Sequence, residues 1–226
     1  MTAAARSEVR QEFVSRIPAG YSTWTHLALP SLLALAILAA SLGALRQVEA
    51  WQFALLPAFL VAGNAVEWHA HRGLLHRHVR ILARLHRAHS LHHRIYATDD
   101  MAMRDPRELP LVLLPWDVFL LPMAVVLLVA SALGAAGQPN LAALWMATAA
   151  AHVLAYEWLH LLCHLPPARL ERHLPFLAAL RRHHALHHSP QLHRFNLNVT
   201  LPLWDAVRGT LWQPGRGAAA ADRASP

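Results

Sequence analysis

The sequence predicts an all-α integral membrane protein, a bundle of four helices in two hairpins with a helical cap on its cytosolic side. Three observations lead to this fold class. Hydrophobic residues make up 55% of the 226 residues and charged residues only 15%, which is too apolar for an ordinary soluble domain of this length. Four long apolar blocks divide the chain, and the arginines lie outside them, mostly on one side.

Each apolar block is predicted to be a membrane-spanning helix. The blocks cover residues 27–45, 51–70, 111–133 and 141–163. The first is uncharged and 19 residues long, enough to cross about 30 Å of hydrocarbon at about 1.5 Å per residue. A cleaved signal peptide is the alternative for this block, but its polar lead of 26 residues and its long apolar run argue against it. Prolines in the third block predict kinks.

The connections between the blocks predict the topology. The links at 46–50 and 134–140 are short and force two helical hairpins. All 20 basic residues are arginines, and only Arg46 falls on the far side of the membrane. The positive-inside rule therefore predicts a multi-pass protein of a bacterial-type cytoplasmic membrane, with both termini in the cytosol.

These blocks divide the chain into a single domain and a short tail. The domain is predicted at 1–212, with its cytosolic cap formed by 71–110 and 164–212. The tail at 213–226 is rich in small residues and is predicted to be disordered.

Composition restricts the kinds of partner and site. A net charge of +7 is compatible with nucleic acid, but the arginines lie where they would meet lipid headgroups, so no nucleic-acid partner is expected. The single cysteine, Cys163, excludes an intrachain disulfide and a CxxC site. Histidine, with 18 copies, is the abundant residue that can bind a transition metal.

The histidines are clustered at helical spacings. Residues 89–93 and 184–188 each contain an HxxHH pattern, whose three rings converge within about 100° of a helix. His160 and His164 are four apart. His71 and His76 are five apart, about 140° on an ideal helix, so they share a site only if the helix bends or loosens, which Gly73 permits.

Ten histidines in four groups, all near the cytosolic side, are predicted to bind two metal ions. Ten imidazoles exceed what one ion can hold, and they suit iron, zinc, copper or nickel. The candidate ligands are His71, His76, His89, His92, His93, His160, His164, His184, His187 and His188. Nearby arginines would disfavour protonated imidazole, or bind headgroups or an acidic electron donor, or only set the topology.

Other polar residues are candidate partners of these ligands. The candidates are His69, His86, His152, Glu157 and His183. His183 is also four residues before His187, so it competes with His184 as a ligand. His152 lies at membrane depth, where it is expected to bond Glu157 or line a substrate path.

Five stretches together resemble the fatty acid hydroxylase and sterol desaturase superfamily. They are EWHAHRGLLHR at 67–77, HSLHH at 89–93, YEWLHLLCH at 156–164, HALHH at 184–188 and FNLNVTLPLWDAVRGT at 195–210. The resemblance implies a four-helix membrane stalk under a cytosolic cap, the ten histidines as ligands of two iron ions, dioxygen as co-substrate, and a separate electron donor such as a cytochrome b5- or ferredoxin-like protein. Zinc is expected as an adventitious substitute for iron.

The chain departs from the superfamily in several places. It has no fused cytochrome b5 domain, and the usual Pro-x-Asp after the second box reads IYATDD. The closing glycine is replaced in NLNVT, and the fourth histidine group has His164 followed by leucine, whereas some members have a second histidine.

The function expected from these features is O2-dependent hydroxylation of an unactivated C–H bond in a membrane lipid, fatty-acyl or sterol-like. Carotenoid-ring hydroxylation and lipid desaturation remain alternatives with the same chemistry. The non-enzymatic alternatives are a membrane metal-binding or transport protein and a haem electron carrier. A haem carrier would need lone histidines on separate helices inside the bilayer, whereas these histidines cluster outside it.

Overall fold

The structure, a computed structural model, describes residues 1–114, 118, 120–166 and 173–214. These residues form helices and no strand, and their only β-type pairing is an isolated bridge between Ala97 and Asp100. The prediction of an all-α fold is therefore confirmed for the described part of the chain.

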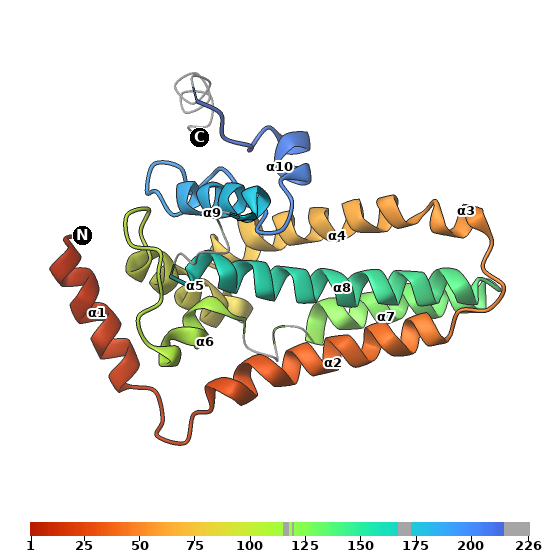
Figure 1. The fold of residues 1–226 in the computed structure, drawn as a ribbon, viewed down its shortest axis with the longest axis horizontal. Helices are drawn as coiled ribbons and strands as arrows, with labels where there is room; N and C mark the ends of the chain where they lie inside the picture. Colours follow the sequence, from red (N-terminus) through yellow and green to blue (C-terminus); the bar gives the residue numbers. More distant parts are fainter. Residues whose placement is uncertain (115–117, 119, 167–172, 215–226) are drawn as a thin grey trace.

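Four long helices lie side by side and form the body of the molecule (Figure 1). They are α2 (Thr23–Gly43), α4 (Leu56–Ala70), α7 (Leu120–Ala135) and α8 (Pro139–His164). Helix α8 is central, because it packs against each of the other three. The short α3 (Ala50–Phe53) precedes α4 at the end of the bundle where the turns of both hairpins lie.

The shorter elements gather at the opposite end of the bundle and form the cap (Figure 1). They are α1 (Ala3–Ser15), the π-helix η1 (His71–Leu75), η2 (Arg80–Leu82), α5 (Ala83–Ile95), η3 (Pro106–Glu108), α6 (Leu109–Val112), α9 (Pro175–His187) and α10 (Leu203–Arg208). An apolar cluster that includes Ile95, Tyr96 and Leu109 is buried in the cap, where Val9 and Phe13 of α1 pack against it.

The two hairpin turns are joined at the far end of the bundle. The Asn140 side chain accepts a hydrogen bond from the Arg46 backbone N–H at 3.0 Å and donates to the Arg46 carbonyl at 2.7 Å. Its amide also donates to Gln52 at 3.2 Å. Because this one side chain bonds the turn that carries Arg46, the two hairpins are fixed relative to each other at this end.

Among the described helices, α2 alone is long and apolar enough to cross a membrane. Its mean hydropathy is 1.8, and only 6% of its apolar window is buried, so most of its side chains face outward. The apolar stretch of α7, Pro122–Ala135, is shorter. The expectation of four membrane spans is therefore not established by length and composition.

Two of the predicted spans are not continuous helices. Residues 51–70 are divided between α3 and α4, and the break precedes Pro57, because proline is tolerated only in the first turn of a helix. In 111–133, α6 ends at Val112 and Leu113 is extended, whereas α7 begins only at residue 120. The predicted kink at Pro115 and the tail from 215 onward lie outside the described residues.

The other two predicted spans lie in single helices. Residues 141–163 fall within α8, and α2 covers 27–43 of the expected 27–45.

Candidate metal centre

The histidines of the cap and of the adjoining helix ends form two groups. Site A comprises His71, His76, His89, His93 and His187, and site B comprises His92, His164, His184 and His188. Within each site, one ring nitrogen of every member lies within 4.8 Å of the others. The structure thus brings together nine of the ten predicted ligands. The tenth, His160, lies beside site B, with its ring centroid 4.8 Å from that of His184.

A π-helical turn brings His71 and His76 together. The His76 N–H donates to the His71 carbonyl at 3.1 Å, which closes an i→i+5 turn across η1. The wider turn aligns residues five apart, and the two rings stack with their centroids 5.0 Å apart. The helix is therefore wider between His71 and His76, as the five-residue spacing predicted for a shared site.

Each HxxHH cluster serves both sites. On α5, His89 and His93 point into site A whereas His92 belongs to site B, and on α9, His187 belongs to site A while His184 and His188 belong to site B. Each triplet therefore contributes to both groups, one of the two arrangements that the spacing allowed. The side chains at i+3 and i+4 point about 100° apart around the helix axis. The i+3 histidine therefore reaches one site, while the i and i+4 histidines reach the other.

Backbone carbonyls orient four of the rings through Nδ1. The pairs are His71 with Leu197, His187 with Phe195, His164 with Met101, and His188 with Tyr96. A carbonyl can only accept a hydrogen bond, so each Nδ1 carries the proton and each Nε2 presents a lone pair toward its site. This arrangement fixes the tautomer and orientation that a metal ligand needs.

The Nε2 atoms converge beyond what hydrogen bonds can satisfy. The Nε2 of His89 lies 3.1 Å from that of His71, 3.1 Å from that of His76 and 3.0 Å from that of His93. An imidazole nitrogen offers either one hydrogen or one lone pair, so it makes one good hydrogen bond rather than three. In site B, the Nε2 of His184 faces those of His164 at 3.0 Å and His188 at 3.1 Å. A cation among these nitrogens satisfies them all.

The rings of the cap are held in the neutral form. Burial, with neighbouring histidines adding to it, lowers the pKa of His76 to about 2. Burial also lowers the pKa of His188 to about 3 and that of His92 well below its usual range. Neutral imidazole is the form that binds metal, so the cap histidines are ready to coordinate at neutral pH.

The loop at residues 195–200, here called the C-terminal loop, carries the carbonyls that orient two site A rings. Asp205, fully buried on α10, accepts hydrogen bonds from Leu197 N at 3.0 Å, Asn198 N at 2.8 Å and Thr210 Oγ1 at 2.6 Å. Burial alone raises the pKa of Asp205, but these hydrogen bonds, with one from His183, bring it below its usual value. The carboxylate therefore holds the loop in its charged form.

Helix α4 holds the other side of the C-terminal loop. Glu67 accepts from the backbone N–H of Val199 and from Thr200 N at 3.1 Å and Thr200 Oγ1 at 2.6 Å. The Asn64 amide donates to the Leu201 carbonyl at 2.8 Å. Sequence reasoning missed these roles, although the NLNVT and LWDAVRGT stretches were a signal for a folded turn.

The replaced closing glycine has a structural explanation. Asn196 adopts a positive φ of 55°, a left-handed conformation that glycine usually takes and that asparagine tolerates better than most residues. Its side chain donates to the His183 carbonyl at 3.1 Å and accepts from Trp212 N at 2.9 Å. Asparagine therefore occupies here a conformation that usually favours glycine.

Two of the candidate partner residues support the centre from outside. His86 donates through Nδ1 to the Leu75 carbonyl at 2.9 Å and so secures the end of the π-helix. His183 contacts the Asn198 carbonyl through Nε2 at 3.0 Å. His69 does neither, because its ring packs against Trp68, with centroids 4.8 Å apart, away from both sites.

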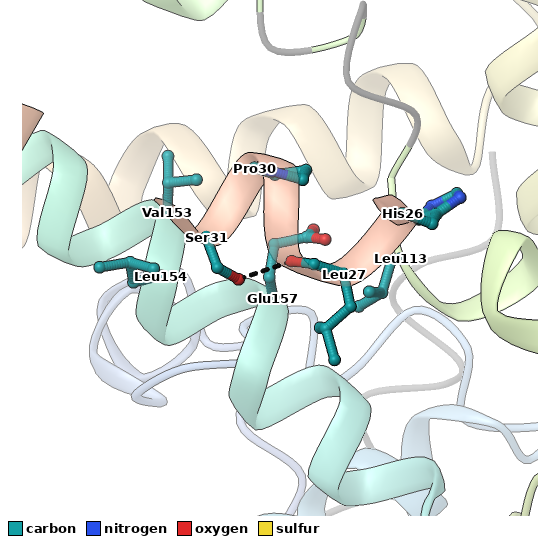
Figure 2. A pocket seen from close by; sticks show the side chains of 8 residues that line it. All are labelled: His26, Leu27, Pro30, Ser31, Leu113, Val153, Leu154 and Glu157. Atoms are coloured by element: carbon teal, nitrogen blue, oxygen red, sulfur yellow. Dashed lines mark hydrogen bonds between the residues drawn. The ribbon is translucent and has the colours of Figure 1, made fainter. Parts of the chain in front are cut away.

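The expected pairing of His152 with Glu157 is wrong. His152 Nε2 lies 3.2 Å from Glu67 instead, and its ring fills the space left by Gly63, where a Cβ would come within 3.3 Å of it. Glu157 faces a small recess between α2 and α8, together with Pro30 and Ser31 (Figure 2). The two side chains serve different faces of α8.

Comparison with known proteins places the chain in a family. The family model described as "Fatty acid hydroxylase" matches residues 56–210, which include all of sites A and B. The chain belongs to the fatty acid hydroxylase family. At the level of this family it is a membrane-associated oxidoreductase that hydroxylates lipids.

A solved structure has a similar fold. It is full-length scs7p, in which only the hydroxylase domain is visible, and it matches with a TM-score of 0.59 and 17% sequence identity over 86% of this chain and 68% of that chain. The comparison of the present chain with curated protein sequences found no match.

Proposed function

We propose that the chain uses dioxygen and two iron ions, one at site A and one at site B, to hydroxylate an unactivated C–H bond of a membrane lipid. The reaction balances as RH + O2 + 2e⁻ + 2H⁺ → ROH + H2O. The observation that carries the proposal is the Nε2 atom of His89, which faces three other Nε2 atoms at 3.0–3.1 Å. Such a convergence of lone pairs suits a metal ion.

The spacing of the close nitrogen pairs would suit imidazole ligands of a transition-metal ion. For a metal–nitrogen bond of about 2.1 Å, two ligand nitrogens lie about 3.0 Å apart at a right angle and about 3.4 Å apart at the tetrahedral angle. The close Nε2 pairs of both sites measure 3.0–3.1 Å. Site A would hold its ion with five imidazoles and site B with four, and because imidazole also binds zinc, zinc remains an adventitious substitute.

The roles of the chain's own residues are to hold the ions, keep the rings neutral and exclude water. His164, His184 and His187 are fully buried. Iron bound by imidazole supplies the activation of dioxygen and the oxidation of the C–H bond. The polar carboxylate of Glu157, one turn before His160 on α8, is suited to contact a polar group of the substrate rather than an ion.

The arrangement of the helices supports a membrane placement for the proposed enzyme. Helices α2, α4, α7 and α8 would form the membrane stalk, with both ends of the described chain and the metal centre on the cytosolic side (Figure 1). Exposed apolar residues such as Leu32 and Leu128, 63% and 71% accessible, would face lipid tails. A fatty-acyl or sterol-like substrate would enter from the bilayer, and carotenoid-ring hydroxylation and desaturation use the same entry.

The proposal is tested by changing one ligand of site A. We expect His89→Ala to reduce the iron content from about two ions per chain to about one and to abolish the formation of hydroxylated lipid, because all three close contacts converge on this ring. The matched control is His173→Ala, at an exposed histidine outside both sites. The measurements are metal analysis of the purified chain and lipid analysis of cells that express each variant. Unchanged lipids in the His89 variant would refute an oxygenase, and a Soret band would favour a haem carrier.

We infer that electrons reach the centre from a separate protein, and one cavity suits contact with such a donor. A cavity of about 350 Å³ opens to the surface beside site A and is lined mainly by polar side chains, including His76, His86, His93 and His193. Each of these four is followed in the sequence by an exposed arginine, at 77, 87, 94 and 194. The lining residues include no acid. A polar opening whose lining residues adjoin exposed arginines in the sequence suits an acidic redox protein, cytochrome b5- or ferredoxin-like, better than a lipid tail.

Charge reversal at two of these arginines tests the electron-donor surface. We expect Arg87→Glu with Arg94→Glu to slow reduction of the iron by an acidic ferredoxin about tenfold at low salt, because oppositely charged patches speed association. Reduction by dithionite, a small reagent, should not change. Arg16→Glu, at the exposed end of α1, is the control. Equal rates in the variant and the control would place the donor elsewhere.

A further inference from the structure

The N-terminal helix contributes a buried arginine to the cap. Helix α1 lies outside residues 56–210, the part of the chain that matches the family model. Arg10, on the face of α1 that packs on the cap, is only 4% exposed. A buried guanidinium needs acceptors for its hydrogen bonds and a nearby negative charge, so its partners indicate what it does.

The partners of Arg10 lie on one segment. Its Nη1 donates to Glu108 Oε2 at 2.8 Å and to the Ala102 carbonyl at 3.0 Å, and the guanidinium lies over the Tyr96 ring, 5.2 Å from its centroid. Glu108 is fully buried and also accepts from the Tyr96 hydroxyl at 2.8 Å. Its other oxygen accepts from Arg104 N at 3.1 Å and Asp105 N at 3.0 Å. Arg10 and Glu108 therefore tie both ends of residues 96–105, here called the brace loop, to α1.

The brace loop contacts site B through its backbone. The Tyr96 carbonyl accepts from His188 Nδ1 at 2.7 Å, and the Met101 carbonyl accepts from His164 Nδ1 at 2.8 Å. Met103 N donates to the His164 carbonyl at 2.7 Å. Both histidines belong to site B. In site A, by contrast, His71 and His187 bond through Nδ1 to carbonyls of the C-terminal loop.

We propose that Arg10 and Glu108 are positioning residues of site B: they fix the brace loop so that the Tyr96 and Met101 carbonyls orient His188 and His164. This inference rests on the proposed function, since it requires site B to bind a metal. No contact of either side chain with a ligand is found, so the effect passes through the loop backbone and through the Tyr96 ring, which packs against the rings of His92 and His164. Partners that orient ligands in this way typically contribute a factor of about 10–100 to metal affinity.

The test separates the two sites with single-ligand variants and uses Co²⁺ as the probe. In a His89→Ala chain, in which site A is disabled, we expect Arg10→Met to weaken Co²⁺ binding at site B about 10–100-fold. In a His92→Ala chain, in which site B is disabled, the same substitution should leave Co²⁺ binding at site A unchanged. Arg16→Met is the matched control, because Arg16 lies on the same helix with an exposed ion pair to Glu12.

Further variants keep the proposal open to refutation if Arg10→Met folds poorly. Tyr96→Phe removes one hydrogen bond to Glu108 and keeps the ring, so a smaller loss confined to site B is expected. Arg10→Lys, which retains the charge, should recover part of the affinity and the visible Co²⁺ spectrum. Equal losses at both sites, or no loss at site B, would overturn the proposal. Failure of the unmodified chain to bind two ions would instead refute the proposed function.

Discussion

His184→Ala is expected to empty site B and abolish lipid hydroxylation, whereas His183→Ala should leave both ions in place. The His184 ring is fully buried, and its Nε2 faces those of His164 at 3.0 Å and His188 at 3.1 Å. His183, its neighbour in the sequence, is directed instead to the Asn198 carbonyl at 3.0 Å. Loss of this contact and of the one to Asp205 at 3.6 Å removes no ligand and should cost about 1–2 kcal/mol.

The adjacent pair provides its own control, because the two variants differ by one position on α9. Iron analysis should give about one ion per chain for His184→Ala and about two for His183→Ala, and only the second should retain hydroxylated lipid. Loss of metal in both variants would mean that α9 tolerates no change. Loss in His183→Ala alone would show that the two rings exchange roles and that site B is assigned incorrectly.

Asp205→Ala is expected to have the largest effect on stability and to empty site A before site B. Removal of the buried carboxylate leaves Leu197 N, Asn198 N and Thr210 Oγ1 without their acceptor, a cost of about 3–5 kcal/mol in the free energy of unfolding. The released segment carries the Leu197 and Phe195 carbonyls, which orient His71 and His187. The measurements are the thermal midpoint in detergent and the Co²⁺ affinity of each site.

The matched control and the pH dependence make this prediction specific. Glu12→Ala removes an exposed ion pair with Arg16 and should cost less than about 1 kcal/mol. Because the folded pKa of Asp205 is lowered, its contribution is fully present above its unfolded pKa of about 3.9 and is lost as the pH falls through the folded value. The difference between wild type and Asp205→Ala should therefore stay constant from pH 7 to 5 and shrink below about pH 4. A difference that shrinks already between pH 7 and 5 would contradict a charged Asp205.

Local periodicity was enough to predict the helices and the candidate ligands. Apolar blocks and the i, i+3, i+4 spacing of histidines depend only on the geometry of a helix over one or two turns. The sequence also indicated that His71 and His76 could meet only through a loosened turn, and η1 is such a turn. It did not predict that the apolar blocks at 51–70 and 111–133 are not continuous helices, although each contains a proline, Pro57 or Pro115, that disfavours a continuous helix.

The tertiary structure decided how the same residues divide and what holds them. The assignment of His92 to one site and His93 to the other, and the choice of His184 over His183, depend on which elements face α5 and α9. His152 meets Glu67 on α4 rather than its near neighbour Glu157. Three of the four carbonyls that orient the rings, and the buried pair of Arg10 and Glu108, join residues 63 to 126 positions apart. Only the Phe195 carbonyl lies near its ring in the sequence, eight positions from His187. Spacing along one helix determines which side chains share a face of that helix. Which residues of other elements contact that face is decided only when distant segments pack together.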